Sequence, residues 1–419
     1  MKPAKNQSKV QIVQPKFADR FECLGAQCPE DCCSGWQITI DKSTYETYQR
    51  SEHKGLKNRF RSQVVPLKQE QTEESFASIA KSVGSNSCTF LDQGLCAIQR
   101  SLGEERLSNT CFNFPRSYVR FEEEVELSMT LACPAVANLA LTTSDAFEFE
   151  LKTQTIRTRT IKRVQGNSST VEEKNELRVF AIQLMKDPGQ PTWKKLITLG
   201  VLCERFDELA SAGITQAGKK VVDSYHHIVA SGQLDDLLSQ IGSQPKLQAE
   251  AFLLLMQAIS FSPLTELARA RIKLVLKGLG GDPETGEVPL DNLDNRYELG
   301  TLQLSQLLAD HPWFLNHVLL GDIMSSGFPF DRESAYRSFV GLSARFGIVR
   351  LMLAGTAQLT EPKPSVDDLA QVVQTFSRHY RHHAEFASNL DNCLIRSGWS
   401  SLDRMILFLR TPHETYVTS

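Results

Sequence analysis

The residues in this chain whose type and spacing suit chemistry are its cysteines. Ten occur in 419 residues, and eight of them lie in the first third of the chain. These eight are Cys23, Cys28, Cys32, Cys33, Cys88, Cys96, Cys111 and Cys133. The other two, Cys203 and Cys393, stand alone in sequence that predicts helices, where a single cysteine is typical of a small buried hydrophobic residue. The first third is therefore organised around sulfur chemistry.

Clustered cysteines support three chemistries: disulfide bonds, structural zinc, or an iron–sulfur centre. Disulfides need an oxidising compartment. Residues 1–15 are polar and basic and lack the apolar segment of a secretory signal. No apolar run approaches the roughly 18 residues that span a membrane. We therefore expect a cytoplasmic protein with reduced thiols, in which such a cluster binds a metal.

The spacing indicates a metal without choosing which one. The chain has no C-x2-C pair, the usual sign of a zinc ribbon. It also lacks both standard ferredoxin runs. Cys28-x3-Cys32 begins the pattern of radical S-adenosylmethionine enzymes, but Cys33 follows at once where a gap of two residues is required. Eight thiolates would fill one four-iron cluster plus a zinc, two clusters, or one centre with four bystanders.

Two predicted hairpins bring distant cysteines together. Residues 88–98 read as two short extended segments joined at a turn, with Gly94 as the residue of positive φ. Residues 117–121 and 125–129 alternate apolar and polar side chains and predict a second hairpin. Cys111 precedes its first strand and Cys133 follows its second, so pairing of the strands draws these two cysteines toward each other.

The fold class that we predict is mainly α. Residues 1–20 are a polar lead-in, residues 21–165 a small, irregular α+β cysteine-rich metal domain, and residues 166–419 an all-α domain of about ten helices. Within the cysteine-rich part, residues 37–40 predict a strand, Asp41 or Ser43 caps a following helix, and residues 50–87 are polar and mostly helical. A net charge of -3 argues against a nucleic-acid-binding protein.

A family resemblance rests on several spaced motifs. The chain resembles the flagellin lysine N-methyltransferase family, and its core order also resembles a broader class of zinc- or iron-chelating cysteine-cluster proteins. The matching motifs are Cys23-x4-Cys28-x3-Cys32-Cys33-x-Gly35-Trp36, Cys88-x-Phe90-Leu91, Gly94-x-Cys96, Cys111-x3-Pro115-Arg116, Glu126-Leu127-Ser128 leading to Cys133-Pro134, and, more weakly, Phe314-Leu315-Asn316, Gly327-Phe328-Pro329-Phe330 and Thr375-Phe376-Ser377-Arg378.

The resemblance implies a function that composition does not show. It implies a [4Fe-4S] cluster held by the eight cysteines, with zinc as the alternative metal. It also implies S-adenosylmethionine as methyl donor and surface lysines of flagellin as acceptors, with the reaction in the cytoplasm before export. Oligomerisation and peripheral association with a membrane stay open. The alternating strands and helices of the ordinary methyltransferase fold are missing, so the donor site is not placed.

Several side chains near the cysteines are candidates for roles in that reaction. Trp36, Tyr45 and Tyr48 either wall a substrate pocket or pack in a core. Arg116 either holds the carboxylate of the donor or forms a structural salt bridge. The acidic run 122–126 either docks a basic substrate surface or is a solvated turn. The candidate bases are Asp41, Asp92 and Tyr45.

Three functions therefore remain: an iron–sulfur methyltransferase acting on flagellin, a non-catalytic module in which zinc staples the cysteine-rich domain, and a redox or iron-handling protein. Features of the helical part add little. The glycines of residues 278–281 follow a predicted helix, and they lack the strand that a nucleotide-binding loop requires. His379 and His383 are spaced as i and i+4 and indicate an exposed polar face.

Overall fold

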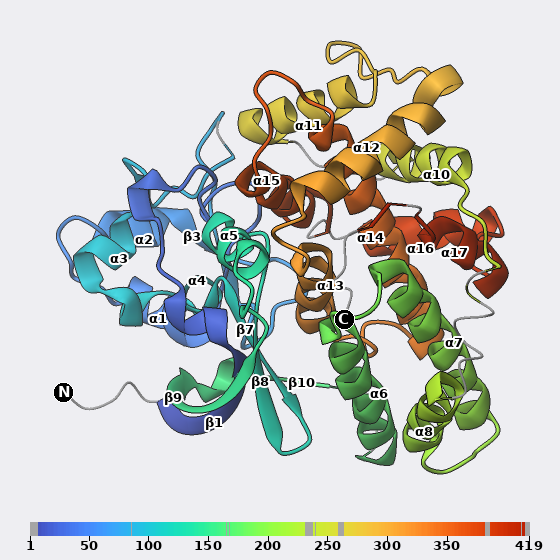
Figure 1. The fold of residues 1–419 in the computed structure, drawn as a ribbon. Coiled ribbons are helices and arrows are strands. Elements are labelled where there is room, and N and C mark those ends of the chain that lie inside the picture. The colour runs from blue at the N-terminus through green and yellow to red at the C-terminus, as the bar shows by residue number, and fades with distance from the viewer. Residues whose placement is uncertain are drawn as a thin grey trace.

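The computed structural model describes residues 7–414 apart from residues 85, 165, 167, 231–237, 239, 259–263, 382–385 and 412. The N-terminal third lies on one side of the molecule and the helical part on the other, as Figure 1 shows in blue to teal and in green to red. This arrangement confirms the predicted fold class, a mainly α protein with a small α+β region at its beginning.

A five-stranded sheet joins the two parts, with strand order β10-β7-β8-β1-β9. Its strands are β1 (Gln7–Pro15), β7 (Arg116–Phe121), β8 (Glu124–Met129), β9 (Phe149–Arg157) and β10 (Lys162–Arg163). The hairpin β7–β8 confirms the one that alternation predicts, and Arg116 pairs with Met129 at its open end. The predicted boundary near residue 165 falls between β10 and the first long helix.

Strand β1 lies where the sequence predicts only a polar lead-in, so that interpretation is wrong from residue 7 onward. The strand runs parallel to β8, with Ile12 opposite Val125, and antiparallel to β9 along its whole length. Ile12 and Gln14 are both fully buried. The buried Gln14 donates to Asp19 (2.9 Å) and Glu150 (2.8 Å), and a polar residue at an inward position hides the alternation of a strand.

The cysteine-rich part is built from short elements around a core of its own. Its described elements are η2 (Gly25–Gln27), β2 (Thr39–Ile40), α1 (Lys42–Gln49), α2 (Lys57–Gln63), β3 (Val64–Pro66), β4 (Ala77–Ile79), β5 (Leu91–Asp92), β6 (Leu95–Cys96), α3 (Ala97–Leu102), η3 (Glu104–Arg106) and α4 (Asn109–Asn113). Strands β2, β4 and β3 form a second sheet. The prediction that residues 50–87 are mostly helical is therefore wrong beyond α2.

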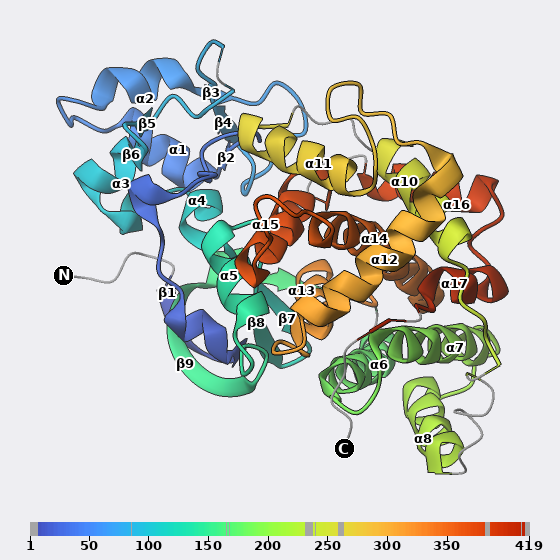
Figure 2. The same cartoon turned by 45° about the horizontal axis from the view of Figure 1, so that its top comes forward.

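The helical part packs around one central helix. Its described helices are α6 (Ser168–Lys186), α7 (Thr192–Ser211), α8 (Ala217–Ala230), α10 (Pro245–Ala258), α11 (Glu266–Gly278), α12 (Leu293–Leu307), α13 (Phe314–Ser326), α14 (Ala335–Ala357), α15 (Val366–Phe376), α16 (Phe386–Arg396) and α17 (Leu402–Leu409). Helices α7, α10, α11, α12, α15 and α17 all contact α14, which both views show in the middle of the bundle (Figures 1 and 2).

Among the described helices, α14 is the one that is long and apolar enough to cross a membrane, and its apolar stretch is entirely buried by neighbouring helices. Helix α15 ends at Phe376 and a π-helical turn, η6 (Ser377–Arg381), follows it.

Helix α5 (Pro134–Thr142) connects the regions. It follows Cys133 directly and packs against α13 and α15, and it lies beside α15 in both views (Figures 1 and 2). The sheet and α5 share the large core of the helical part, which holds Ile12, Leu127 and Cys133. The segment from Cys33 to Leu107 has the separate small core. The cysteines therefore lie where the two cores meet.

Candidate metal centre

Seven of the eight clustered cysteines line one cavity of about 150 Å³. They are Cys23, Cys28, Cys32, Cys33, Cys96, Cys111 and Cys133. The eighth, Cys88, is buried beneath the cavity, where its backbone N–H donates to the carbonyl oxygen of Cys33 at 2.7 Å. Segments up to 110 residues apart in sequence thus bring all eight predicted ligands to one place. Cys203 is fully buried in α7, and Cys393 packs against the core from α16, as expected of isolated cysteines.

The first predicted hairpin places Cys96. Leu91 pairs with Cys96 across β5 and β6. The two turn residues, Gln93 and Gly94, have φ values of 53° and 75°, the backbone that a tight two-residue hairpin requires. A side chain on Gly94 would also meet the backbone of Ala26 at 3.4 Å. Glycine is therefore favoured here for its backbone conformation, and the segment that carries Cys28 lies in ordinary van der Waals contact with the turn.

The second hairpin places Cys111 and Cys133. Cys111 lies in α4, whose first turn is capped by the side chain of Ser108. Beyond the paired strands, the backbone N–H of Thr130 donates to Pro115 at 3.0 Å, so the pairing continues toward both cysteines. Cys133 is the N-cap residue of α5. The expectation that closing this hairpin gathers the two cysteines is confirmed.

Backbone N–H groups point at several of the sulfur atoms. Phe90 donates to Cys88 Sγ at 3.4 Å. Cys96 and Cys133 each precede a helix, and their sulfurs accept hydrogen bonds from amides of the first turn, with those of Ala135 and Val136 reaching Cys133. Such donors stabilise negative charge on sulfur at a helix N-terminus. These sites therefore suit thiolate ligands, although burial raises the pKa of the uncomplexed Cys133 thiol to about 11.

Cys32 and Cys33 act together and not apart. The Cys33 thiol is in hydrogen-bond contact with both Cys32 and Cys88. By donating to them, Cys33 lowers the pKa of Cys88 and lowers the pKa of Cys32 to about 7, to which the positive charge of Arg378 also contributes. The pKa of Cys33 itself is raised by the same contacts. The contacts of Cys33 therefore favour the thiolate form of Cys32 and of Cys88.

The arrangement of the thiols and the volume of the cavity bear on which metal centre these residues would fit. Among the described residues, no three His, Cys, Asp or Glu side chains converge on one point as a single ion requires, whereas zinc draws its thiolates to about 2.3 Å. A volume of about 150 Å³ has room for roughly ten water-sized spheres of about 15 Å³. Thiols spread around such a space fit an iron–sulfur cluster, which several cysteines bind at its edges.

Two charged side chains at this cavity are free to meet a ligand. Arg116 is the one cation among the described residues that line it. Its guanidinium stacks on the ring of Phe21 at 5.1 Å, and it forms no ion pair with another described residue, so the structural salt bridge considered for it is absent there. Glu104 is an exposed carboxylate in the same lining. Sequence reasoning missed Glu104, because nothing in its local pattern separates it from other surface glutamates.

The mouth of the cavity is apolar. Leu24 and Leu95 line the cavity and are 43% and 38% exposed. Trp36 lies next to it, where its ring contacts Phe114 and its Nε1–H donates to the carbonyl oxygen of Cys32 at 2.9 Å. Of the three aromatic residues expected to wall a pocket, Trp36 is therefore the one beside the cysteines.

The other two aromatic candidates pack in the small core. Tyr48 is buried, stacks on Phe60 at 4.2 Å and donates to the carbonyl oxygen of Arg106 at 2.7 Å. Tyr45 packs on Phe76 at 5.1 Å. Neither lines the cysteine cavity, so the core-packing alternative describes both, and Tyr45 is not placed to act as a base.

The two carboxylates proposed as bases have structural partners instead. Asp41 is the buried N-cap residue of α1, and it accepts hydrogen bonds from Ser43, Thr44 and the backbone of Asn109. These donors lower its pKa although burial opposes them. Asp92 forms an ion pair with Arg59 at 2.9 Å, and this lowers its pKa. Neither lines the cavity, so we no longer consider them as bases.

The acidic run is divided between two roles. Residues 122–124 are exposed at the tip of the β7–β8 hairpin. Glu126 instead forms an ion pair with the buried Arg178, whose guanidinium also donates to the carbonyl oxygens of Ile323 (3.2 Å) and Phe328 (3.1 Å). Glu126 thus fastens the sheet to α6 and α13, and only the tip is open to a partner.

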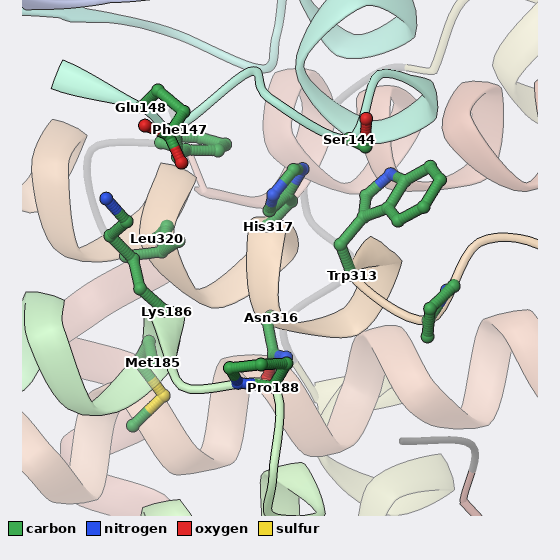
Figure 3. A pocket seen from close by; sticks show the side chains of 11 residues that line it. Ser144, Phe147, Glu148, Met185, Lys186, Pro188, Trp313, Asn316, His317 and Leu320 are labelled. Atoms are coloured by element: carbon green, nitrogen blue, oxygen red, sulfur yellow. The ribbon is translucent and has the colours of Figure 1, made fainter. Parts of the chain in front are cut away.

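A second cavity, of about 210 Å³, lies at the opposite end of α5 from Cys133 (Figure 3). His317 and Trp313 line it, and Glu148 and Lys186 lie at its side. The Nδ1 atom of His317 is 2.8 Å from the carbonyl oxygen of Ala140. Burial lowers the pKa of this imidazole to about 4. The nine residues of α5, at 1.5 Å each, separate this cavity from the cysteines, so His317 belongs to a different site.

Two further motifs of the helical part also have structural explanations. A Cβ on Gly278 would lie 1.8 Å from the carbonyl oxygen of Gly355, so this glycine permits α11 to cross α14 closely and is not part of a phosphate loop. His379 is buried and faces Glu30 at 3.1 Å, which corrects the expectation of an exposed face. His383, the residue paired with it in sequence, lies outside the described residues.

Comparison with known proteins identifies the family. Residues 178–408, more than half of the chain, match the family model of the FliB lysine N-methylase C-terminal domain. The chain belongs to the FliB lysine N-methylase family. The resemblance read from the sequence motifs is thereby confirmed, and the family model covers the helical part, where those motifs were weakest.

Two relatives align with this FliB family member along nearly its whole length, and a third aligns with one third of it. Lysine-N-methylase of Salmonella typhimurium (strain LT2) is 24% identical over 404 residues, which are 93% of this chain and 97% of the relative. Lysine-N-methylase of Salmonella choleraesuis (strain SC-B67) is 24% identical over 406 residues, with the same coverage. Flagellar biosynthetic protein FliU of Salmonella muenchen is 33% identical over 139 residues, 33% of this chain and 81% of the relative. No solved structure matches the chain.

Proposed function

We propose that this protein is an iron–sulfur lysine N-methyltransferase that modifies surface lysines of flagellin, with S-adenosylmethionine as methyl donor. The observation that carries the proposal is the convergence of eight cysteines from distant segments on one cavity, in a family named for lysine N-methylation. The name of the FliU relative points to the flagellum. The reaction would take place in the cytoplasm before flagellin is exported.

The residues that would hold the cluster belong to the set of eight cysteines, since a [4Fe-4S] cluster takes four thiolate ligands. A bound [4Fe-4S] cluster would supply either electron transfer or a metal position for the polar end of the donor. N–H groups of α5 and of the β6–α3 junction stabilise thiolate charge at Cys133 and Cys96. Among the described residues no three His, Cys, Asp or Glu side chains converge on one point, and on this ground we take zinc as the weaker alternative.

The substrate lysine must lose its proton before it accepts a methyl group. An unperturbed lysine has a pKa of about 10.4, and desolvation lowers the pKa of an amine. The exposed apolar side chains of Leu24, Leu95 and Trp36 at the mouth would remove water from an entering lysine. Glu104 lies in the lining, and we assign it the role of receiving the lysine proton.

The donor requires a partner for its carboxylate. Arg116 presents a guanidinium to the cavity without an acidic partner among the described residues, and guanidinium groups bind carboxylates through two parallel hydrogen bonds. In the overall transfer, the bond from sulfur to the methyl carbon breaks and a bond from the lysine nitrogen to that carbon forms. The products are a neutral thioether, a methylated lysine and a proton.

The first experiment is metal analysis of protein purified without oxygen. We expect about four irons and four acid-labile sulfides per chain, a brown colour that bleaches in air, and methyl transfer to purified flagellin monomers from labelled donor. One or two zincs without sulfide would contradict the cluster mechanism. Bound iron and sulfide with no methyl transfer would instead favour a redox or iron-handling protein.

A further inference from the structure

The helical domain reaches into the cysteine site through one arginine. Arg378 lies in the π-helical turn η6 and donates hydrogen bonds to three backbone carbonyl oxygens of the cysteine-rich part. Its Nη2 atom is 2.8 Å from both Asp31 O and Ser34 O, and Nη1 is 3.3 Å from Glu30 O. These three carbonyl groups flank Cys32 and Cys33. One side chain from near the C-terminus therefore fixes the backbone on both sides of the adjacent cysteines.

This backbone has little regular structure to hold it otherwise. Between Cys28 and Gln37 there is no helix or strand, and a single bridge joins Ser34 to Ser87. Buried carbonyl groups outside regular structure need other donors. The Arg378 guanidinium supplies them, and it does so from more than 340 residues away in sequence.

A buried carboxylate joins the same loop to the helical domain. Glu30 is 4% exposed. It accepts a hydrogen bond from Thr265 Oγ1 at 2.5 Å, its Oε1 is 3.1 Å from His379 Nε2, and Arg271 lies 3.9 Å away. The loop is thus anchored immediately before the paired cysteines as well as around them.

Helix α15, which η6 continues, also holds the segment that carries Cys133. Gln374, in the last turn of α15, donates from Nε2 to the carbonyl oxygen of Ala132 at 3.0 Å, and both groups are buried. The Oε1 atom of Gln374 accepts from Arg271 at 3.0 Å. Arg271 therefore connects the anchor of the Cys133 segment with the anchor of Glu30.

The turn that carries Arg378 has unusual geometry. Helix α15 changes from α to π form at Ser377, and π-helical turns are rare and often found at functional sites. The consecutive residues Arg378 and His379 both contact the cysteine-rich part, and Gln374 lies one turn earlier.

We infer that Gln374, Arg378 and His379 are positioning residues that set the separation of the Cys32–Cys33 loop from the Cys133 segment, and so the shape of the metal-binding cavity. This inference rests on the proposed function in one respect, namely that these cysteines bind the metal centre. It gives the helical domain a task in the site: the domain fastens two of the cysteine segments with hydrogen bonds, and none of its described residues lines the cavity.

The test compares Arg378→Ala and Arg378→Lys with Arg404→Ala in the full chain, purified without oxygen. Arg404 is a matched control, since it also donates to a backbone carbonyl, that of Gly398 at 3.0 Å, but far from the cysteines.

Loss of a residue that orients metal ligands typically costs about 10-fold to 100-fold in metal affinity. We expect Arg378→Ala to release iron to a chelator about 10-fold faster than the wild type and to change the electron paramagnetic resonance spectrum of the reduced protein. Arg378→Lys should be intermediate, because an ammonium cannot reach three carbonyl groups, and Arg404→Ala should match the wild type.

Circular dichroism and thermal melting of the same samples separate positioning from folding. A well-folded Arg378→Ala protein with the iron release and spectrum of Arg404→Ala would overturn the inference. If Arg378→Ala does not fold, Gln374→Ala, which removes a single bond to the Cys133 segment, is judged by the same criteria. If the wild type holds zinc and no sulfide, the proposed function fails, and the inference is then tested separately by the rate of zinc release to a coloured chelator.

Discussion

The helical part and the cysteine-rich part are stabilised in different ways. Nearly every residue of α14 is buried, and a single apolar core extends from it through the surrounding helices into the sheet. The cysteine-rich part has short strands and helices, a small core, and free thiols at its edge. The contrast teaches that one region rests on a continuous apolar core, whereas the other combines a small core with hydrogen bonds that it receives from the helical part.

Loss of a cysteine ligand should have the largest effect and should be confined to one region. Cys96→Ser replaces a thiol at the start of α3 with a hydroxyl that binds iron poorly. We expect loss of the bound metal and of methyl transfer, with protease cleavage appearing within residues 21–134 while the helical part stays resistant. Iron analysis and mass spectrometry of the fragments provide the measurement. Cys393→Ser is the control, and equal metal loss in it would contradict the assignment of the eight cysteines.

A mutation that creates a cavity in the large core should destabilise the helical part and leave the metal content unchanged. Leu351, in α14, is fully buried, and truncation of such a leucine to alanine costs about 2–5 kcal/mol. We therefore expect Leu351→Ala to lower the melting temperature of the helical part while iron and sulfide per chain stay at the wild-type level. Leu299→Ala, at a half-exposed position of α12, serves as the control. A loss of metal from Leu351→Ala at low temperature would show that the stability of the cysteine-rich part depends on the core of the helical part.

The contact between the regions should depend on pH through His317. Its pKa of about 4 in the folded protein lies below the value of about 6.5 for an unfolded histidine. The unfolded chain therefore takes up a proton between these values and the folded protein does not, so stability is full above pH 6.5 and falls as the pH drops to 4. The largest loss from this group is about 3 kcal/mol. His317→Gln keeps a donor for Ala140, and denaturant melts at several pH values should show a flatter dependence for it. Parallel curves for the two proteins would exclude this role.

Chemistry in the cysteine-rich part should be separable from its stability. Removal of a general base usually lowers the rate by about 100-fold or more. We expect Glu104→Gln to lower kcat for methyl transfer by about this factor without changing the metal content. Glu105→Gln alters the neighbouring carboxylate, which does not line the cavity, and should leave kcat unchanged. Equal rates for the two variants would remove Glu104 from the mechanism.

The smallest expected effect is on the binding of the donor. A hydrogen bond to a charged group is worth about 1.5–3 kcal/mol, so Arg116→Ala should weaken binding of S-adenosylmethionine about 10-fold or more. Equilibrium dialysis with labelled donor measures this directly. Arg120→Ala, on the same strand but bonded to Glu123 at the hairpin turn, is the matched control. Unchanged binding in Arg116→Ala would leave the donor carboxylate without an assigned partner.

Local patterns predicted much of the cysteine site. The eight clustered cysteines, the turn at Gly94 and the β7–β8 hairpin are all properties of short segments, and the structure contains each of them. The helical character of the second half follows equally from apolar residues at helical spacing. Strand β1 escaped prediction because its inward-facing Gln14 is polar and is satisfied by partners in other segments.

Roles of single polar residues were not predictable in the same way. Asp41, Asp92 and Tyr45 have the right chemistry for a base, but whether a carboxylate is free depends on which donors the fold brings to it. The donors to Asp41 include Asn109, and the partner of Asp92 is Arg59. Glu104 is open for the converse reason, since no described side chain pairs with it.

The sequence by itself determined that this protein gathers thiols in its first third, places them on hairpins and helix ends, and continues as a helical domain, because these features depend on residue type and local spacing. Tertiary structure alone decided that Cys32, Cys33 and Cys88 are in contact, that Arg116 and Glu104 face the cavity, and that Arg378 fixes a loop more than 340 residues earlier. Such long-range contacts depend on how two cores pack against each other, and no local pattern records that.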